Sequence, residues 1–190
     1  MKEIKEKSIL TIDLDWIIES SQTMLLFNFL IKKLITTKKI IFIKSHHLLL
    51  KYHENETSIY NIDHHHDLGY KETDDPKLIE NKIYREGNWL LHLIHNNIIN
   101  KYVWINNINS DLKSPHLNEV RNLEYYHHSI DINILNNLNF DKVVICESFE
   151  YEKTSLLFEL LKSICICIFN DKTLLDDTKN ISSFIKISLD

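Results

Sequence analysis

Short runs of apolar residues alternate along this chain with longer amphipathic segments. The short runs have the length of buried strands, whereas the longer ones carry apolar residues at the spacing of one helix face, as at Met24, Phe27, Leu30, Ile31 and Leu34. Parallel strands need a crossover connection, which a helix usually supplies. The alternation therefore predicts a three-layer α/β/α fold in which helices cover both faces of a mainly parallel, doubly wound sheet.

The expected elements are spread through residues 1–190, which we expect to form a single domain. We expect strands at Ser8–Ile12, Ile40–Ile43, Ser58–Ile62, Tyr102–Ile105, Lys142–Cys146 and Ile164–Ile168. We expect helical segments at Glu19–Ile35, Asn88–Ile99, Ile132–Leu138 and Thr154–Lys162. The polar stretch Lys71–Glu86 is expected to be a long surface excursion, of a kind that often has a function.

The composition excludes several kinds of site. Gly69 and Gly87 are the two glycines of the chain, so neither a G-x-G-x-x-G loop nor a P-loop can be present. The 22 basic and 27 acidic residues give a formal net charge of −5, which argues against a nucleic-acid-binding surface. Dinucleotide, Walker-type nucleotide and nucleic-acid binding are therefore not expected.

Cysteine usage and the amino terminus predict where the protein works. Cys146, Cys165 and Cys167 are an odd number without a C-x-x-C pair, so we expect buried, reduced thiols. Met1–Lys7 has no apolar segment of an export signal, and charged residues interrupt the apolar stretches elsewhere. We expect a cytoplasmic protein without a membrane-spanning helix.

Two carboxylates and three histidines directly follow the expected strand that ends at Ile62. Alternate residues of an extended backbone point to one side, so Asp63, His65 and Asp67 can converge. His64 and His66 would then face elsewhere. This D-x-H-x-D pattern predicts half of a metal site.

Ligand-type residues also follow other expected strands. Asp13 and Asp15 follow the first, His46 and His47 follow the second, and Glu147 follows the strand that ends at Cys146. Ligands of open parallel sheets bind beyond the carboxyl ends of the strands. Carboxylates mixed with imidazoles favour Mn, Fe or Zn over Mg or Ca, and the set is large enough for two ions.

Each motif also has a purely structural interpretation. The triple histidine can be a solvated turn, and a D-x-D pair after a strand can simply cap the helix that follows. The occurrence of all these motifs at strand ends favours the metal site over the structural interpretation.

The segment Ile62–Asp67 resembles the D-x-H-x-D signature of the arginase and deacetylase superfamily, whose core is a doubly wound parallel sheet over a binuclear manganese site. Taken with Ile12–Trp16, Glu86–Leu90, Val103–Ile105 and Val144–Ser148, it is similar to the peptide arginases. Members of this compact branch convert arginine side chains of ribosomally made peptides to ornithine. The resemblance implies an arginase-like fold and an arginine-containing precursor peptide as partner.

The resemblance also implies roles for the metal ligands. Asp63 would bridge two manganese ions, and His65 and Asp67 would each bind one. Asp13 and Asp15 would take the place of a second carboxylate pair, which in ordinary arginases follows the D-x-H-x-D segment, whereas here it precedes it.

The remaining implied roles concern the last imidazole and the substrate. His46 or His47 would supply the imidazole, and spacing does not choose between them. Glu147 would hold the guanidinium through a charge-assisted pair of hydrogen bonds. The candidate catalytic residues are Glu147 and Asp67, and the candidate substrate-binding residues are Glu147, Asn88 and Trp89.

Two other functions fit the same residues. A DHH-type phosphoesterase also uses manganese, aspartates after strands and a D-H-H segment, here Asp63-His64-His65, but the chain has no separate glycine-rich substrate domain. The third possibility is an inert α/β domain that binds a partner protein. Activity assays would distinguish the three: a peptide arginase releases urea, a phosphoesterase cleaves a phosphodiester, and an inert domain does neither.

Overall fold

The computed structural model describes residues 7–17, 20–54, 56–69, 77, 81, 83, 87–107, 110, 124–129, 131–147, 152–169, 171, 173–174 and 187–188. The strands are β1 (Ser8–Asp13), β2 (Lys39–Ile43), β3 (Ser58–Ile62), β4 (Lys101–Asn106), β5 (Glu124–Ser129), β6 (Lys142–Cys146), β7 (Thr173–Leu174) and β8 (Ile187–Ser188). The helices are α1 (Ser20–Thr36), α3 (Trp89–His95) and α4 (Glu152–Ile168), with the short 3₁₀ helices η1 (Leu14–Trp16), η2 (His46–Lys51) and η4 (Ile132–Leu135).

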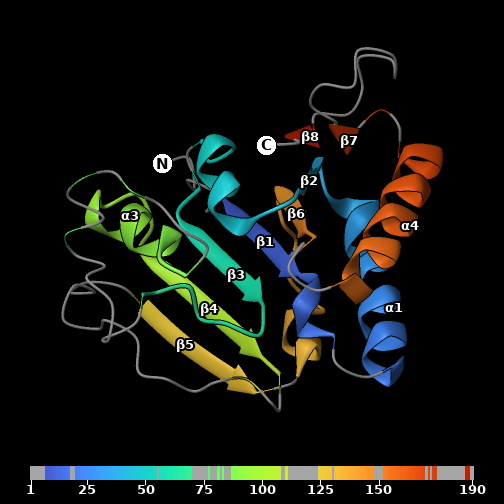
Figure 1. Ribbon diagram of the computed structural model, residues 1–190, viewed down its shortest axis with the longest axis horizontal. Coiled ribbons are helices and arrows are strands. Elements are labelled where there is room, and N and C mark those ends of the chain that lie inside the picture. Colours follow the sequence, from blue (N-terminus) through green and yellow to red (C-terminus); the bar gives the residue numbers. More distant parts are fainter. Residues whose placement is uncertain are drawn as a thin grey trace, which may run out of the picture.

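The strands form one sheet in the order β5-β4-β3-β1-β6-β2-β7, and β8 also pairs with β2 (Figure 1). Each of these pairings is parallel. The central strands β1, β2 and β6 carry runs of Ile, Val, Leu and Phe and are buried except for half-buried Lys39 at the start of β2, as expected for parallel strands covered on both faces.

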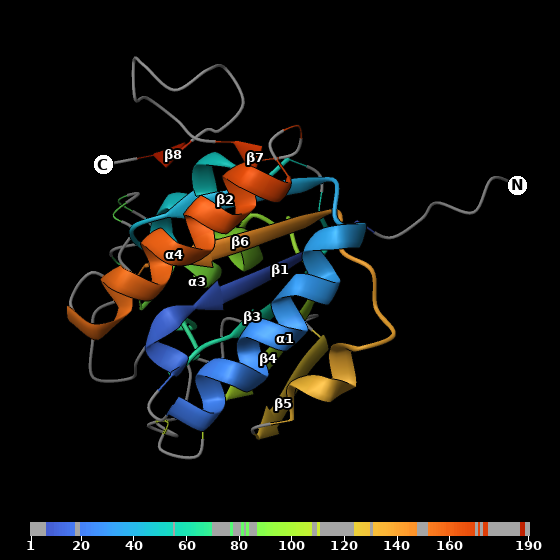
Figure 2. The same cartoon turned by 90° about the vertical axis from the view of Figure 1, so that its right-hand side faces the viewer.

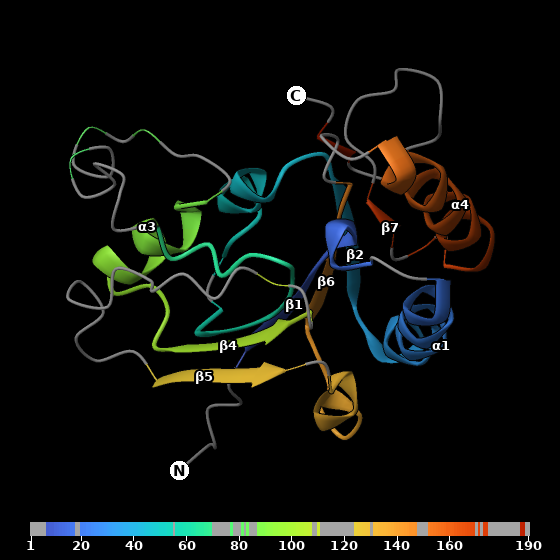
Figure 3. The same ribbon diagram turned by 60° about the horizontal axis from the view of Figure 1, so that its bottom comes forward.

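Helices cover both faces of this sheet. α1 and α4 lie side by side on one face (Figure 2), and α3 lies with η2 on the other (Figure 3). Alternate residues of one strand enter the two layers, because Leu10 and Ile12 of β1 belong to the core under α1 and α4, whereas Ile9 belongs to the core under α3. The expected mainly parallel α/β fold is confirmed.

The strand expected at Ile164–Ile168 is wrong, because these residues are the end of α4. Phe158, Leu161 and Cys165 are buried at helical spacing, while Cys167 and Ile168 are exposed. A run of alternating Ile and Cys is compatible with the period of a strand and with that of a helix. The segment is helical because one face of the helix packs against the core. Cys167 also corrects the expectation that all three thiols are buried.

The structure contains a further strand, β5, in a stretch where we expected neither a strand nor a helix. It pairs with β4 at one edge of the sheet and carries aromatic and polar residues rather than an apolar run. The helix expected at Asn88–Ile99 is shorter, and the piece expected at Ile132–Leu138 is a 3₁₀ helix. Of the expected surface excursion Lys71–Glu86, only positions 77, 81 and 83 are among the described residues.

No helix among the described residues combines the length and the apolar character that a membrane-spanning segment requires.

A buried ion pair joins the amino end of β6 to the segment before β3. Nζ of Lys142 lies 2.6 Å from a carboxylate oxygen of Glu56 and donates to the carbonyl of Tyr52 at 2.6 Å. Both charged side chains are at most 5% exposed. Burial acts to raise the pKa of Glu56. The hydrogen bond from Lys142, the backbone N–H of Glu54 and the charge of Lys142 together outweigh burial and lower this pKa below its usual value.

This pair predicts a pH-dependent contribution to stability. Because the folded-state pKa of Glu56 is lowered, its contribution is complete above the unfolded-state pKa of about 4.3 and is lost as the pH falls through the folded-state pKa. Glu56→Gln should lower the free energy of unfolding by about 3–5 kcal/mol at neutral pH. In urea unfolding, this difference from the wild type should shrink as the pH falls below about 4.

The neighbouring Glu54 provides the control for that measurement. It also pairs with Lys142, at 3.2 Å, but its side chain is 55% exposed. Glu54→Gln should therefore cost only about 0–1 kcal/mol. A Glu56→Gln cost that is equally small, or that is the same at every pH, would contradict the assigned role of the buried pair.

Candidate metal centre

The ligand-type residues meet where the chain changes from one face of the sheet to the other. β1 and β3 are neighbours in the sheet, but the connection after β1 runs through α1 on one face and that after β3 through α3 on the other. Asp13 ends β1, and Asp63 directly follows β3. The carboxyl ends of two such strands form the crevice in which open α/β sheets bind their ligands.

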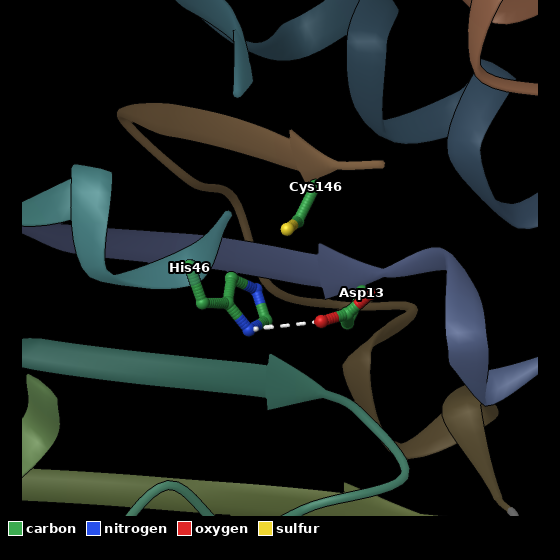
Figure 4. Close-up of side chains that lie close together, drawn as sticks. All are labelled: Asp13, His46 and Cys146. Carbon is green, nitrogen blue, oxygen red and sulfur yellow. Dashed lines mark ion pairs between the residues drawn. The ribbon is translucent and has the colours of Figure 1, made fainter. Parts of the chain in front are cut away.

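His46 lies at the centre of the first group of side chains. It is buried and is the first residue of η2, three residues after the last residue of β2. Its Nδ1 lies 3.3 Å from Oδ2 of Asp13 (Figure 4), 3.0 Å from Oδ2 of Asp63 and 3.2 Å from Oδ2 of Asp67. One imidazole nitrogen thus faces three carboxylates.

Asp63 joins this group to a second one. Its Oδ2 faces His46, whereas its Oδ1 accepts a hydrogen bond from the backbone N–H of His65 at 2.7 Å. Nδ1 of His65 lies 3.8 Å from that Oδ1 and 3.1 Å from Oδ2 of Asp15. The ligand atoms of His46, Asp63 and Asp67 lie within 4.8 Å of one another. The same distance holds for the ligand atoms of His65, Asp15 and Asp63. Asp63 is common to the two sets.

Neighbouring polar side chains hold the ligand atoms in place. Thr11 Oγ1 lies 2.8 Å from Nε2 of His46, which leaves Nδ1 for the carboxylates. Asn61 donates to Oδ2 of Asp63 at 3.0 Å, and the indole N–H of Trp89 donates to Oδ2 of Asp67 at 2.7 Å. Such outer contacts orient metal ligands and set their basicity.

The backbone of Asp67 has an unusual conformation. Its φ of 55° lies in the left-handed region, which costs energy for residues other than glycine, although aspartate tolerates it better than most. The loop continues to Gly69, with φ 70°, whose N–H donates to the carbonyl of Gly87 at 2.8 Å just before α3. This contact helps to hold the loop beside Trp89, where Asp67 can accept the indole hydrogen bond.

The crowded carboxylates have a strong electrostatic effect on one another. Burial, and then the negative charge of Asp63, raise the pKa of Asp15; burial and the charge of Asp67 raise that of Asp63. Burial acts to lower the pKa values of both histidines, but the carboxylates outweigh it, raising the pKa of His46 well above its usual value and that of His65 to about 9. The site therefore holds excess negative charge that bound cations would offset.

The donor set fits a divalent metal ion. Each ligand set combines carboxylate oxygens with an imidazole nitrogen. Burial is high, since Asp13, Asp15, Asp63 and Asp67 are at most 8% exposed. Buried carboxylates without a compensating cation are costly, and this mixture of donors suits Mn, Fe or Zn. Metal binding requires neutral imidazoles, so protons on His46 and His65 would compete with it.

The structure distinguishes among the remaining expected site residues. His46 joins the cluster, whereas Nδ1 of half-buried His47 lies 2.6 Å from Ser45 Oγ. Asn88 and Trp89 are both buried, and the indole N–H of Trp89 donates to Asp67. Glu147 is half-buried directly after β6, and its N–H donates to the carbonyl of Ile43 at 2.9 Å.

Three side chains belong to the site although no sequence pattern predicted that they would. Cys146 was expected to be only a buried thiol, yet it lies with Asp13 and His46 in a third set of ligand atoms within 4.8 Å of one another. Thr11 and Asn61 carry no motif, but alternation along β1 and β3 puts them on the same sheet face as Asp13 and Asp63. The capping interpretation of Asp13 also holds, since its Oδ1 accepts from the N–H of Asp15 at the start of η1.

Comparison of the chain with models of known families gave no match, and neither did comparison with curated proteins or with solved structures.

Proposed function

We propose that this protein is a binuclear metal-dependent hydrolase that removes urea from an arginine side chain of a peptide and leaves ornithine. The observation that carries the proposal is the position of Asp63, whose Oδ1 and Oδ2 face two different ligand sets. A carboxylate can bridge two ions in that position. His46, Asp67 and Asp13 would hold one ion, and His65 and Asp15 the other.

The proposed reaction needs water activated at neutral pH. Two divalent ions in such a site, manganese by resemblance, supply that activation. Water then adds to the guanidinium carbon, the bond from this carbon to the side-chain nitrogen breaks, and urea and a primary amine result. The protein's part is to keep Asp63, His46 and Asp67 in a fixed geometry, which the contacts from Asn61, Thr11 and Trp89 support.

Glu147 is our candidate for binding the guanidinium. It directly follows Cys146, whose partner in the register of the neighbouring strand is Asp13, so the backbone of Glu147 begins next to the cluster. Its side chain is half-buried and belongs to none of the metal-ligand sets found among the described residues. A carboxylate can accept two parallel hydrogen bonds from a guanidinium. The peptide context comes from the resemblance to peptide arginases.

The direct test is urea release from an arginine-containing peptide by the manganese-loaded protein. We expect urea and a peptide lighter by the mass of cyanamide, and no product from the same peptide with lysine in place of arginine. Absence of urea from manganese-loaded protein with a panel of arginine peptides would contradict the proposed reaction. Cleavage of a generic phosphodiester instead would favour the DHH-type function.

Glu147→Gln should separate substrate binding from metal binding. We expect unchanged metal content and a rise in KM of about 10- to 100-fold, because a hydrogen bond to a charged group contributes about 1.5–3 kcal/mol. The matched control is Glu159→Gln on α4, which removes only an exposed pair with Lys162. Equal kinetics of the two variants, or loss of metal from Glu147→Gln, would show that Glu147 does not have this role.

A further inference from the structure

Cys146 lies where a metal ligand would lie. Figure 4 shows it on β6, beside Asp13 at the end of β1 and His46 beyond β2. Its Sγ and the ligand atoms of Asp13 and His46 all lie within 4.8 Å of one another, and the thiol is 1% exposed. Neither composition nor any motif had marked this residue as more than a core thiol.

The sheet register explains this position. Cys146 is the direct partner of Asp13 on the neighbouring parallel strand and of Ile43 on the other side. Partners in register point to the same face, and this face is the one covered by η2 and α3, on which His46 lies. The last residue of β6 is therefore presented to the same space as the last residue of β1.

We propose that the Cys146 thiolate is a ligand of the ion bound by His46, and that this makes the two metal positions chemically different. The inference depends on the proposed binuclear site but not on its substrate. As the metal–sulfur bond forms, the thiol proton passes to solvent.

The expected consequence is a difference in metal preference. The position formed by Asp15, Asp63 and His65 offers only oxygen and nitrogen donors, which suit manganese. A thiolate at the other position favours softer ions, so that Zn²⁺, Co²⁺ or Fe²⁺ should be preferred there over Mn²⁺. The protein would then take two different metals rather than two manganese ions.

Cobalt binding tests this directly, because a thiolate bound to Co²⁺ gives a charge-transfer band in the near ultraviolet that oxygen and nitrogen ligands do not give. The whole chain is used with Cys167→Ser, which removes the exposed thiol. We expect the band when metal-free protein is titrated with Co²⁺, and its loss with Cys146→Ser. Cys165→Ser is the matched control, because Cys165 is equally buried but lies in the core on the opposite sheet face.

The outcomes separate this inference from the proposed function. Two bound Co²⁺ ions without the band, or a band that survives Cys146→Ser, would refute the ligand role and leave the binuclear site standing. No bound Co²⁺ would refute the metal site itself and the ligand role with it. If Cys146→Ser does not fold, the variant that carries both Cys165→Ser and Cys167→Ser decides, because Cys146 is then the one thiol left in the chain. A band in that variant must come from Cys146, and bound Co²⁺ without the band would refute the ligand role.

Discussion

Asp63→Asn should abolish binuclear metal binding and with it all hydrolysis. Asp63 is the carboxylate common to both ligand sets, and an amide can offer only one oxygen. Wild-type protein loaded with manganese should retain about two ions per chain, and the variant less than one. At a metal concentration of about 100 Kd, bound metal should raise the thermal midpoint of the wild type by about 5–10 °C and that of the variant by less.

Asp131→Asn is the control for this substitution. Asp131 is exposed and caps η4 by accepting from the N–H of Asn133 at 3.0 Å, a role that asparagine also fills. This variant should bind metal as the wild type does. Elemental analysis after removal of loosely held ions provides the measurement, and full metal content in Asp63→Asn would disprove the bridging role.

Trp89→Phe should weaken metal binding about 10- to 100-fold without loss of the fold. The substitution removes the indole N–H that donates to Asp67 at 2.7 Å but keeps an aromatic ring next to His46, whose ring centre lies 5.6 Å away. Asp67 then loses the contact that holds its carboxylate toward Nδ1 of His46. Competition with a metal-binding indicator measures the change in affinity.

Trp16→Phe is the control for Trp89→Phe, because the two substitutions are matched in size and burial. Both tryptophans are fully buried, but the indole N–H of Trp16 has no hydrogen-bond partner among the residues that the structure describes. The two variants lose the same atoms from the core, so a shared packing cost cancels in the comparison. If both weaken metal binding equally, the hydrogen bond to Asp67 is not what matters.

Much of the fold follows from local patterns. The runs at Ile40–Ile43, Ser58–Ile62 and Lys142–Cys146 lie in β2, β3 and β6 because buried parallel strands need continuous apolar sequence. The two elements that we predicted wrongly or did not predict are equally informative. Ile164–Ile168 has a pattern that suits strand and helix alike, and β5 is an edge strand whose residues lack an apolar run. In both cases contacts with distant residues decided the structure.

The candidate site follows partly from sequence and partly from contacts. Asp63, His65 and Asp67 could be found because ligand-type residues at the end of a parallel strand lie where such sheets bind ligands. They do not converge on one point, however. His65 lies with Asp15, and Asp67 lies with His46, because the chain bends at His64 and His65 and Asp67 has a positive φ, so the segment is not extended.

The amino-acid sequence was enough to predict the class of fold, the strands that end in ligand-type residues and the chemical nature of those ligands. These properties depend on local periodicity and residue type, which a single chain displays directly. Only the tertiary structure chose His46 over His47, assigned Trp89 to Asp67 and brought Cys146 beside Asp13. These choices depend on strand register and on the packing of η2 and α3 over one sheet face, which are set by residues far apart in the sequence.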